Sequence, residues 1–215
     1  MTKILLAGAT GLVGGEALNQ LLADERVTEL VAPTRRPLPP HPKLRNPLTD
    51  QTSLPLDASW WHVDGAICAL GTTRAKAGSA AAFRAIDHDY VLAVARQARA
   101  SGATRFALTS SMGADARVPF LYSRTKGEVE QAIAQLGFPS LTIVRPGLLG
   151  GQRAEPRPLE QALEKLLRIA APVLPASARI SPAATVARIL VEAAIKGKDG
   201  SHLVSSAQIA RMRHR

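Results

Sequence analysis

The chain has 215 residues, of which 46% are hydrophobic and 20% charged, and this predicts one soluble domain with a sizeable core. A single cysteine excludes a disulfide framework and a cysteine-based zinc site. No apolar run approaches the ~18 residues of a membrane span and no secretion signal is visible, so we expect a cytoplasmic protein without a membrane partner. The net charge of +10 comes from scattered basic residues, which favours a charged surface that binds an anionic cofactor over a nucleic-acid site.

The amino-terminal stretch predicts a strand, a glycine turn and a helix in that order. Residues 4–7 form a short apolar run typical of a buried strand, and apolar residues recur at helical spacing from Leu12 onward. In a dinucleotide fingerprint, Gly8 would permit the tight turn, Gly11 would let the main chain approach a pyrophosphate, and Gly14 would let the helix pack closely. The spacing GxxGxxG differs by one position from GxGxxG, and the alternative is a sharp connection without a ligand. We predict that the cofactor contacts Gly8, Ala9, Thr10, Gly11, Leu12 and Val13.

Two arginines follow the next predicted strand, residues 28–33. In a dinucleotide-binding sheet the end of this strand faces the adenosine ribose, where an acidic residue would bind the 2′-hydroxyl. Arg35 and Arg36 stand there instead, and the guanidinium fork of arginine pairs well with phosphate. These residues predict NADP(H) as the cofactor; the alternative is a basic strand end followed by a loop.

The proline-rich residues 37–56 oppose a long helix, so we expect only a short edge strand at residues 43–48. A turn should follow at residues 57–61, where Trp60 and Trp61 are interpreted as packing residues. The expected crossover helix of this half is therefore reduced to a turn.

Residues 65–70 predict another buried strand, which ends in small residues. In a parallel sheet this end lies next to the first glycine turn, where a cofactor can cross the carboxyl edge. Leu70, Gly71 and Thr72 are therefore candidate cofactor contacts.

Residues 83–100 carry apolar side chains at helical spacing and predict one amphipathic helix. Asp87, His88 and Asp89 stand side by side in it and resemble a metal cluster at first sight. Adjacent helix positions point in different directions, so these three side chains cannot share one ion. We predict no metal site.

A predicted strand at residues 104–109 ends in Ser110 and Ser111, and Tyr122 and Lys126 follow at the head of a helix. Their spacing of four residues puts both side chains on one helix face. A free tyrosine has a pKa of about 10 and is a weak base at neutral pH, but a nearby ammonium stabilises its phenolate. A serine hydroxyl from the strand end can hydrogen-bond the reacting oxygen. The pattern predicts a catalytic set of serine, tyrosine and lysine.

The carboxyl-terminal part begins with a predicted strand at residues 140–144, followed by Pro146 and Gly147. This loop would close over the nicotinamide end of the cofactor; the alternative is a simple turn. Helices are predicted at residues 122–136, 158–169 and 182–196, a short strand at 202–205, and a short helix or frayed tail beyond residue 206. The order of elements predicts an α/β fold, a doubly wound parallel sheet with helices on both faces.

GATGLVGG, the strand-end TRR, SSMGAD, YSRTKGEVE and VRPGLLGG resemble, in order, the motifs of extended or atypical short-chain dehydrogenases/reductases. Within that family, LGTTRAKAGS, AIDHDYVLAVARQA and FLYSRTKGEVE are most similar to the Tat-interacting-protein-like oxidoreductases. The resemblance covers about residues 3–151. It implies a Rossmann sheet, which we expect to form a single domain, residues 1–215. The chain departs from extended members in that we expect a reduced substrate lobe, in small elements at about 147–215.

The resemblance also implies individual roles. Tyr122 would be the catalytic acid/base, and Lys126 would hold the nicotinamide ribose and tune Tyr122. Ser111 would orient the substrate carbonyl, with Ser110 close behind. Asp87 stands where relatives often carry a helix asparagine that supports a proton relay.

Two functions fit these expectations. The first is an NADP(H)-dependent oxidoreductase that transfers hydride to or from a small carbonyl or alcohol substrate, as a monomer or homodimer. The second is a non-catalytic NADP(H)-binding redox sensor that meets a protein partner, which the small substrate lobe favours and the intact Ser, Tyr and Lys set disfavours.

Overall fold

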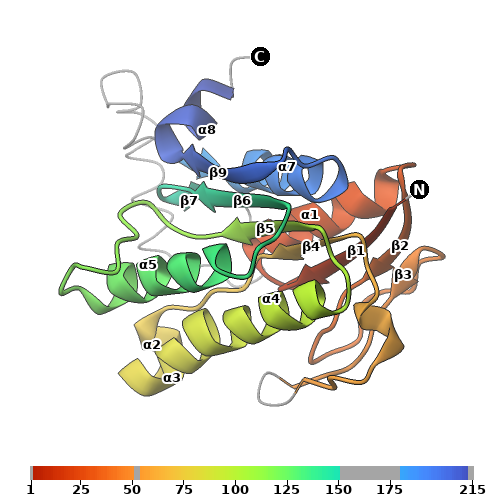
Figure 1. Ribbon diagram of the computed structural model, residues 1–215, viewed down its shortest axis with the longest axis horizontal. Helices are drawn as coiled ribbons and strands as arrows, with labels where there is room; N and C mark the ends of the chain where they lie inside the picture. The colour runs from red at the N-terminus through yellow and green to blue at the C-terminus, as the bar shows by residue number, and fades with distance from the viewer. Residues whose placement is uncertain (1, 51–53, 151–179, 213–215) are drawn as a thin grey trace.

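A computed structural model describes residues 2–50, 54–150 and 180–212. Its main feature is a seven-stranded sheet in which every neighbouring pair is parallel, in the order β3-β2-β1-β4-β5-β6-β9 (Figure 1). The strands are β1 (Thr2–Ala7), β2 (Val27–Val31), β3 (Leu44–Arg45), β4 (Gly65–Cys68), β5 (Arg105–Thr109), β6 (Ser140–Arg145) and β9 (Gly200–Ser205). The predicted doubly wound α/β fold is confirmed.

Helices cover both faces of this sheet (Figure 1). On one face lie α1 (Leu12–Ala23) and α7 (Ala183–Ile195), and on the other lie α4 (Val91–Ala100) and α5 (Leu121–Ala134). Residues 4–7 of β1 are buried on both sides, and this stretch of the strand is continuously apolar, as is typical of a central parallel strand. Its side chains alternate: Ile4 and Leu6 join the core under α1 and α7, whereas Leu5 and Ala7 join the core under α4 and α5.

The strand order reverses between β1 and β4. From β1 the chain builds β2 and β3 outward to one side, and it then returns to form β4 on the other side of β1. In open parallel sheets the crevice for a ligand lies at such a reversal, outside the carboxyl ends of the strands. The loops that follow β1, β4 and β5 all leave from this carboxyl edge.

The helix predicted at residues 83–100 is not continuous. It consists of α3 (Ala80–Arg84), a π-helical turn η2 (Ala85–Tyr90) and α4, preceded by the short α2 (Arg74–Ala77). A π-helical turn widens the helix by one residue and shifts the faces of the residues within it, a change that is frequent at functional sites. Apolar spacing alone did not reveal it because α3 and α4 each keep a normal inner face.

The remaining elements are short. They are the 3-10 turn η1 (Ser59–Trp61), the paired β7 (Leu149–Gly150) and β8 (Ser181–Pro182), and α8 (Ser206–Met212). Trp60 and Trp61 are buried in the core under α4, which confirms that they pack, and the indole of Trp61 donates to the carbonyl of Pro55 at 2.9 Å. The helix predicted at residues 158–169 lies outside the described residues.

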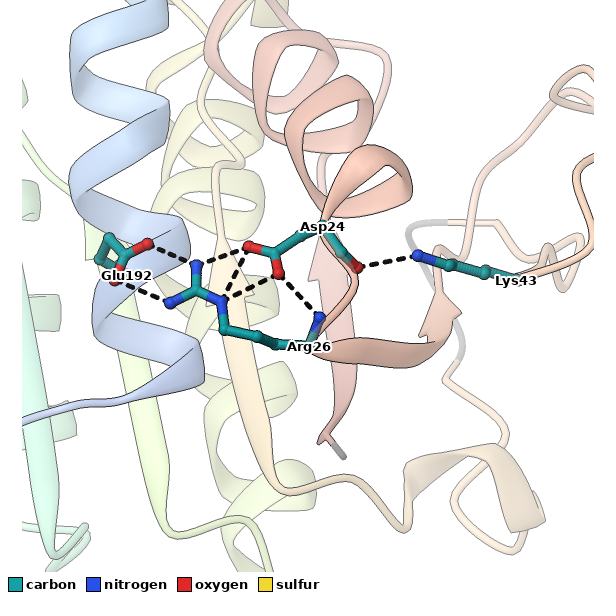
Figure 2. Close-up of polar contacts among 4 residues, drawn as sticks. All are labelled: Asp24, Arg26, Lys43 and Glu192. Carbon is teal, nitrogen blue, oxygen red and sulfur yellow. Dashed lines mark hydrogen bonds and ion pairs between the residues drawn. The ribbon is translucent and has the colours of Figure 1, made fainter.

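An ionic cluster joins helices and strands at the amino edge of the sheet (Figure 2). The guanidinium of Arg26 lies between Asp24, at the end of α1, and Glu192 on α7, with its Nη2 2.5 Å from an oxygen of each carboxylate. Lys43, just before β3, donates to the carbonyl oxygen of Asp24 at 2.8 Å. Hydrogen bonds from Arg26 hold the pKa of both carboxyl groups below their usual range.

Candidate active site

The glycine turn after β1 is tight because side chains would not fit in it. Gly8 has a φ of +92°, and a Cβ there would lie 2.8 Å from the backbone of Ala69. A Cβ on Gly14 would lie 1.9 Å from the carbonyl oxygen of Gly8, so α1 begins directly against the turn. Gly11 is the N-cap of α1 and brings no capping side chain, and the first turn of the helix contains no acidic residue. The first N–H groups of α1 therefore present a partial positive charge to the crevice.

The two arginines after β2 are exposed. Neither Arg35 nor Arg36 forms an ion pair with any residue in the described parts of the chain. Thr34, which precedes them, holds the turn in place because its hydroxyl donates to the carbonyl of Arg36 at 2.6 Å. Both guanidinium groups are free to meet an anionic ligand.

The loop after β4 rests on a buried carboxylate. Asp87, from the π-helical turn, is fully buried and accepts a hydrogen bond from the backbone N–H of Thr72 at 2.8 Å. A Cβ on Gly71 would lie 3.6 Å from Asp87 Oδ1 and 3.7 Å from Lys126 Nζ. Gly71 thus covers an ion pair between Asp87 and Lys126, in which Oδ1 and Nζ are 2.7 Å apart.

Helix α5 carries Tyr122 and Lys126 to this loop in very different environments. The Lys126 side chain is 5% exposed, whereas Tyr122 is 44% exposed, with its ring centroid 5.7 Å from that of Phe83. The helix can approach the carboxyl edge because Gly127 has no side chain. A Cβ there would lie 2.2 Å from the backbone nitrogen of Ala116.

The two serines after β5 differ in their partners. Ser110 donates its hydroxyl hydrogen to Glu130, a buried residue of α5 that also accepts from Arg145 Nε at 2.9 Å. The Ser111 Oγ is buried and has no hydrogen-bond partner among the residues that the structure describes. A buried hydroxyl of this kind can meet a ligand atom or a water molecule. Glu130 also raises the pKa of the Arg145 guanidinium by hydrogen bonding to it.

The loop after β6 is tied to the loop after β5. Met112 donates its backbone N–H to the carbonyl of Pro146 at 2.8 Å, and the N–H of Gly147 donates to the Ser181 hydroxyl at 3.1 Å. The predicted contacts Pro146 and Gly147 therefore lie beside the serine pair. Exposed apolar side chains, those of Met112, Phe120 and Leu148, belong to these same loops and to the start of α5.

The sequence-predicted residues fall into three groups along one edge. Gly8, Ala9, Thr10, Gly11, Leu12 and Val13 form the turn after β1, Arg35 and Arg36 follow β2, and the remaining candidates gather at the ends of β4, β5 and β6. Asp87 joins Thr72 to Lys126, and Gly71 lies next to the Lys126 ammonium. The pairing of Asp87 with Lys126 was not predicted from the sequence, and Glu130 was not among the predicted site residues. No pattern in the sequence gives these pairings, because each partner comes from a different element.

Asp87 is buried and points away from its two neighbours, whereas His88 Nδ1 and Asp89 Oδ1 lie 2.7 Å apart, so the three side chains do not converge. Within the described ranges, no group of three or more His, Cys, Asp or Glu residues could hold a metal ion. None of the helices in those ranges is long and apolar enough to cross a membrane.

A parallel sheet of this order, with a glycine turn after its first strand, defines a Rossmann domain of the kind that binds NAD(P). The chain belongs to the NAD(P)H-binding family, whose model matches residues 8–196. The predicted family resemblance is confirmed at this level, and the Tat-interacting-protein-like subtype stays a prediction.

Fungal proteins named fmp52, mitochondrial, are among its relatives. The Aspergillus fumigatus protein is 36% identical over 210 residues, covering 93% of this chain and 90% of the relative. The Aspergillus clavatus protein is 34% identical over 219 residues, covering 97% and 94%. The Candida albicans protein is 37% identical over 172 residues, covering 75% and 73%.

Solved structures share the fold at low sequence identity. MoeE5 in complex with UDP-glucuronic acid and NAD has a TM-score of 0.72 at 18% identity, covering 94% of this chain and 75% of that protein. The Bordetella bronchiseptica enzyme WbmH in complex with NAD⁺ has a TM-score of 0.69 at 15% identity, covering 96% and 76%.

The expected cytoplasmic location is wrong. The relatives are named as mitochondrial proteins, which contradicts this expectation. The sequence features behind the expectation, a single cysteine and no visible secretion signal, concern the secretory route and do not distinguish the cytosol from other compartments.

Proposed function

We propose that the protein is an NADP(H)-dependent oxidoreductase that transfers hydride to or from a small carbonyl or alcohol substrate, and that it works in mitochondria, as the names of its relatives suggest. The observation that carries the proposal is the arrangement around the end of β4. There the buried Lys126 ammonium lies beneath Gly71, and Tyr122 is exposed one helical turn earlier. Ser111, with its unpartnered hydroxyl, follows the neighbouring strand β5.

The residues present fit a dinucleotide. Gly8 permits the tight turn and Gly14 lets α1 pack directly against it, which are the roles of the first and third glycines of a dinucleotide-binding turn. The N-terminus of α1 favours the diphosphate, and Leu70, Gly71 and Thr72 would border the nicotinamide half. When bound, the nicotinamide supplies or accepts the hydride.

The residues of the chain would handle the proton and the substrate oxygen. The Tyr122 hydroxyl would donate a proton to the oxygen of a carbonyl substrate as it is reduced, and accept one in the reverse direction. Ser111 Oγ would donate a hydrogen bond to the same oxygen. The Lys126 ammonium would hold the ribose hydroxyls. The exposed apolar side chains of Met112, Phe120 and Leu148, in the loops beside the serines and at the start of α5, suit an uncharged carbonyl compound.

The first experiment compares the wild type with Tyr122→Phe. With NADPH and a panel of aldehydes and ketones, Tyr122→Phe should lower kcat about 10²-fold or more, because the proton donor is lost, while the NADPH Kd changes less than about twofold. An unchanged kcat contradicts the mechanism. Saturable NADPH binding by the wild type without turnover of any carbonyl on the panel supports the sensor function instead.

The preference for NADP(H) is proposed from the exposed Arg35 and Arg36. A charge-assisted hydrogen bond to the 2′-phosphate contributes about 1.5–3 kcal/mol, so Arg35→Ala should weaken NADPH binding more than tenfold and leave NADH binding nearly unchanged. Arg96→Ala, which removes an exposed arginine on α4, is the matched control and should change neither affinity. Equal losses for the two cofactors in Arg35→Ala would show that this arginine does not read the 2′-phosphate.

A further inference from the structure

The carboxylate of Asp87 is unusual because it is fully buried and paired at the same time with a backbone N–H and a lysine. Its Oδ2 accepts from Thr72 N at 2.8 Å, and its Oδ1 lies 2.7 Å from Lys126 Nζ. Three separate elements meet in these two contacts: the loop after β4, the π-helical turn η2 and helix α5. A buried ammonium requires such a partner, since an unpaired charge in the interior is very costly.

Other charged groups around the pair do not replace this carboxylate. On β4, burial raises the pKa of the Cys68 thiol to about 11, so Cys68 is neutral near pH 7. On η2, His88 and Asp89 pair with each other at the surface. On α5, Glu128 and Glu130 pair with Arg84 and Arg145 respectively. Among the described residues, Asp87 is the carboxylate that compensates Lys126.

We propose that Asp87 is a positioning residue that fixes the Lys126 ammonium beneath Gly71 and ties it to the backbone of Thr72, so that the cofactor loop after β4 and the lysine form one unit. This inference rests on the proposed function, in which Lys126 holds the nicotinamide ribose. Asp87 Oδ1 neutralises the ammonium through an ion pair, and the ammonium has three N–H donors with which it can reach the ribose hydroxyls.

The carboxylate is needed because an amide cannot do both tasks. In an Asp87→Asn variant the amide oxygen can still accept from Thr72 N–H, but the NH₂ group would then face the ammonium and donor would meet donor. The substitution therefore preserves the contact to the loop and removes the contact to the lysine. It separates the positioning of Lys126 from the packing of the π-helical turn.

The test is a double-mutant cycle on NADPH affinity, measured by titration of the full-length protein. The four proteins are the wild type, Asp87→Asn, Lys126→Met, and the variant with both substitutions. Asp87→Asn should weaken NADPH about tenfold in the wild-type background and have no effect in the Lys126→Met background, because there is no ammonium left to position. Asp89→Asn, which changes an exposed carboxylate on the same turn, is the matched control and should bind NADPH like the wild type.

Each outcome is decisive. If Asp87→Asn weakens NADPH equally in both backgrounds, or behaves like Asp89→Asn, the positioning role is wrong even though Lys126 still serves the cofactor. If Lys126→Met binds NADPH as tightly as the wild type, the proposed role of Lys126 fails, and the inference fails with it. If Asp87→Asn fails to fold because the buried Lys126 ammonium is left without a counter-charge, the NADPH affinities of the double variant and of Lys126→Met are compared. Equal NADPH affinities of these two proteins support the proposal, and unequal affinities overturn it.

Discussion

Ionic clusters hold the two opposite edges of the sheet, and they differ in burial. At the amino edge, Arg26 joins Asp24 and Glu192 across the surface, and Glu192 is 49% exposed (Figure 2). At the carboxyl edge, Asp87 and Lys126 are 0% and 5% exposed and lie under the loop after β4. Exposed ion pairs contribute little to stability, whereas removal of one partner from a buried pair is strongly destabilising.

The difference in burial indicates different roles: the amino-edge cluster is structural, whereas the carboxyl-edge pair belongs to the proposed functional site. The amino-edge cluster ties α1, α7 and the loop before β3 together and faces water, so solvent can replace its contacts. The carboxyl-edge pair sits where the strand order reverses and where hydroxyl and backbone groups converge, so each contact there also orients a residue that the proposed chemistry uses. Substitutions at the carboxyl edge should therefore change cofactor binding and turnover, and those at the amino edge should change stability alone.

The largest effect is expected from Gly14→Ala, since its new Cβ would lie 1.9 Å from the Gly8 carbonyl oxygen. The turn must shift, so NADPH binding should be lost and the free energy of unfolding should fall by about 3 kcal/mol. Calorimetric titration and thermal melting measure both. Gly15→Ala is the control, because its Cβ would meet the nearest atom, the Ala9 carbonyl oxygen, at 3.8 Å. It should bind NADPH normally and gain up to about 1 kcal/mol from helix propensity.

Smaller effects are expected from substitution of the two serines. One substitution should lower turnover and the other should lower stability. Ser111→Ala should lower kcat about 10²-fold with little loss of stability, since the hydroxyl has no partner in the described parts of the chain and would act on the substrate oxygen. Ser110→Ala should keep kcat within severalfold and lower the free energy of unfolding by about 1–3 kcal/mol, because the buried Glu130 loses a donor. If the two kinetic results are exchanged, Ser110 is the serine that meets substrate.

The smallest effect is expected at the amino edge. Glu192→Gln should lower the free energy of unfolding by no more than about 1 kcal/mol, and the difference from the wild type should shrink in 1 M salt. NADPH affinity should not change. A variant that lost NADPH binding would show that this edge is coupled to the site.

The same cluster predicts that the stability of the folded protein depends on pH. Arg26 lowers the pKa of Glu192 in the folded protein from its ordinary value of 4.5, so the stabilisation is complete above pH 4.5 and is lost as the pH falls through the folded pKa. Melting temperatures measured from pH 6 downward should therefore fall less steeply below pH 4.5 in Glu192→Gln than in the wild type. Parallel curves would contradict the contribution of this carboxylate.

Much of the fold could be predicted because its signals are local. Buried parallel strands are short and continuously apolar, as in residues 65–70, and the glycine turn stands between a strand and a helix that are both evident in the sequence. The predicted strand at residues 43–48 was too long. It is the two-residue β3 followed by an isolated bridge between Thr34 and Leu48, because edge pairing depends on how a proline-rich segment meets its neighbour.

The sequence by itself determined the chemistry available at the carboxyl edge. Parallel strands end at the same edge, so residues that follow β1, β4 and β5 must gather there, and four-residue spacing puts Tyr122 and Lys126 on one face of α5. Only the tertiary structure decided how these residues are partnered. The π-helical turn directs Asp87 into the core to meet Lys126, and Glu130 takes the Ser110 hydroxyl and leaves that of Ser111 free. These choices depend on which buried polar groups the packing of separate elements brings within hydrogen-bond distance, and one stretch of sequence does not contain that information.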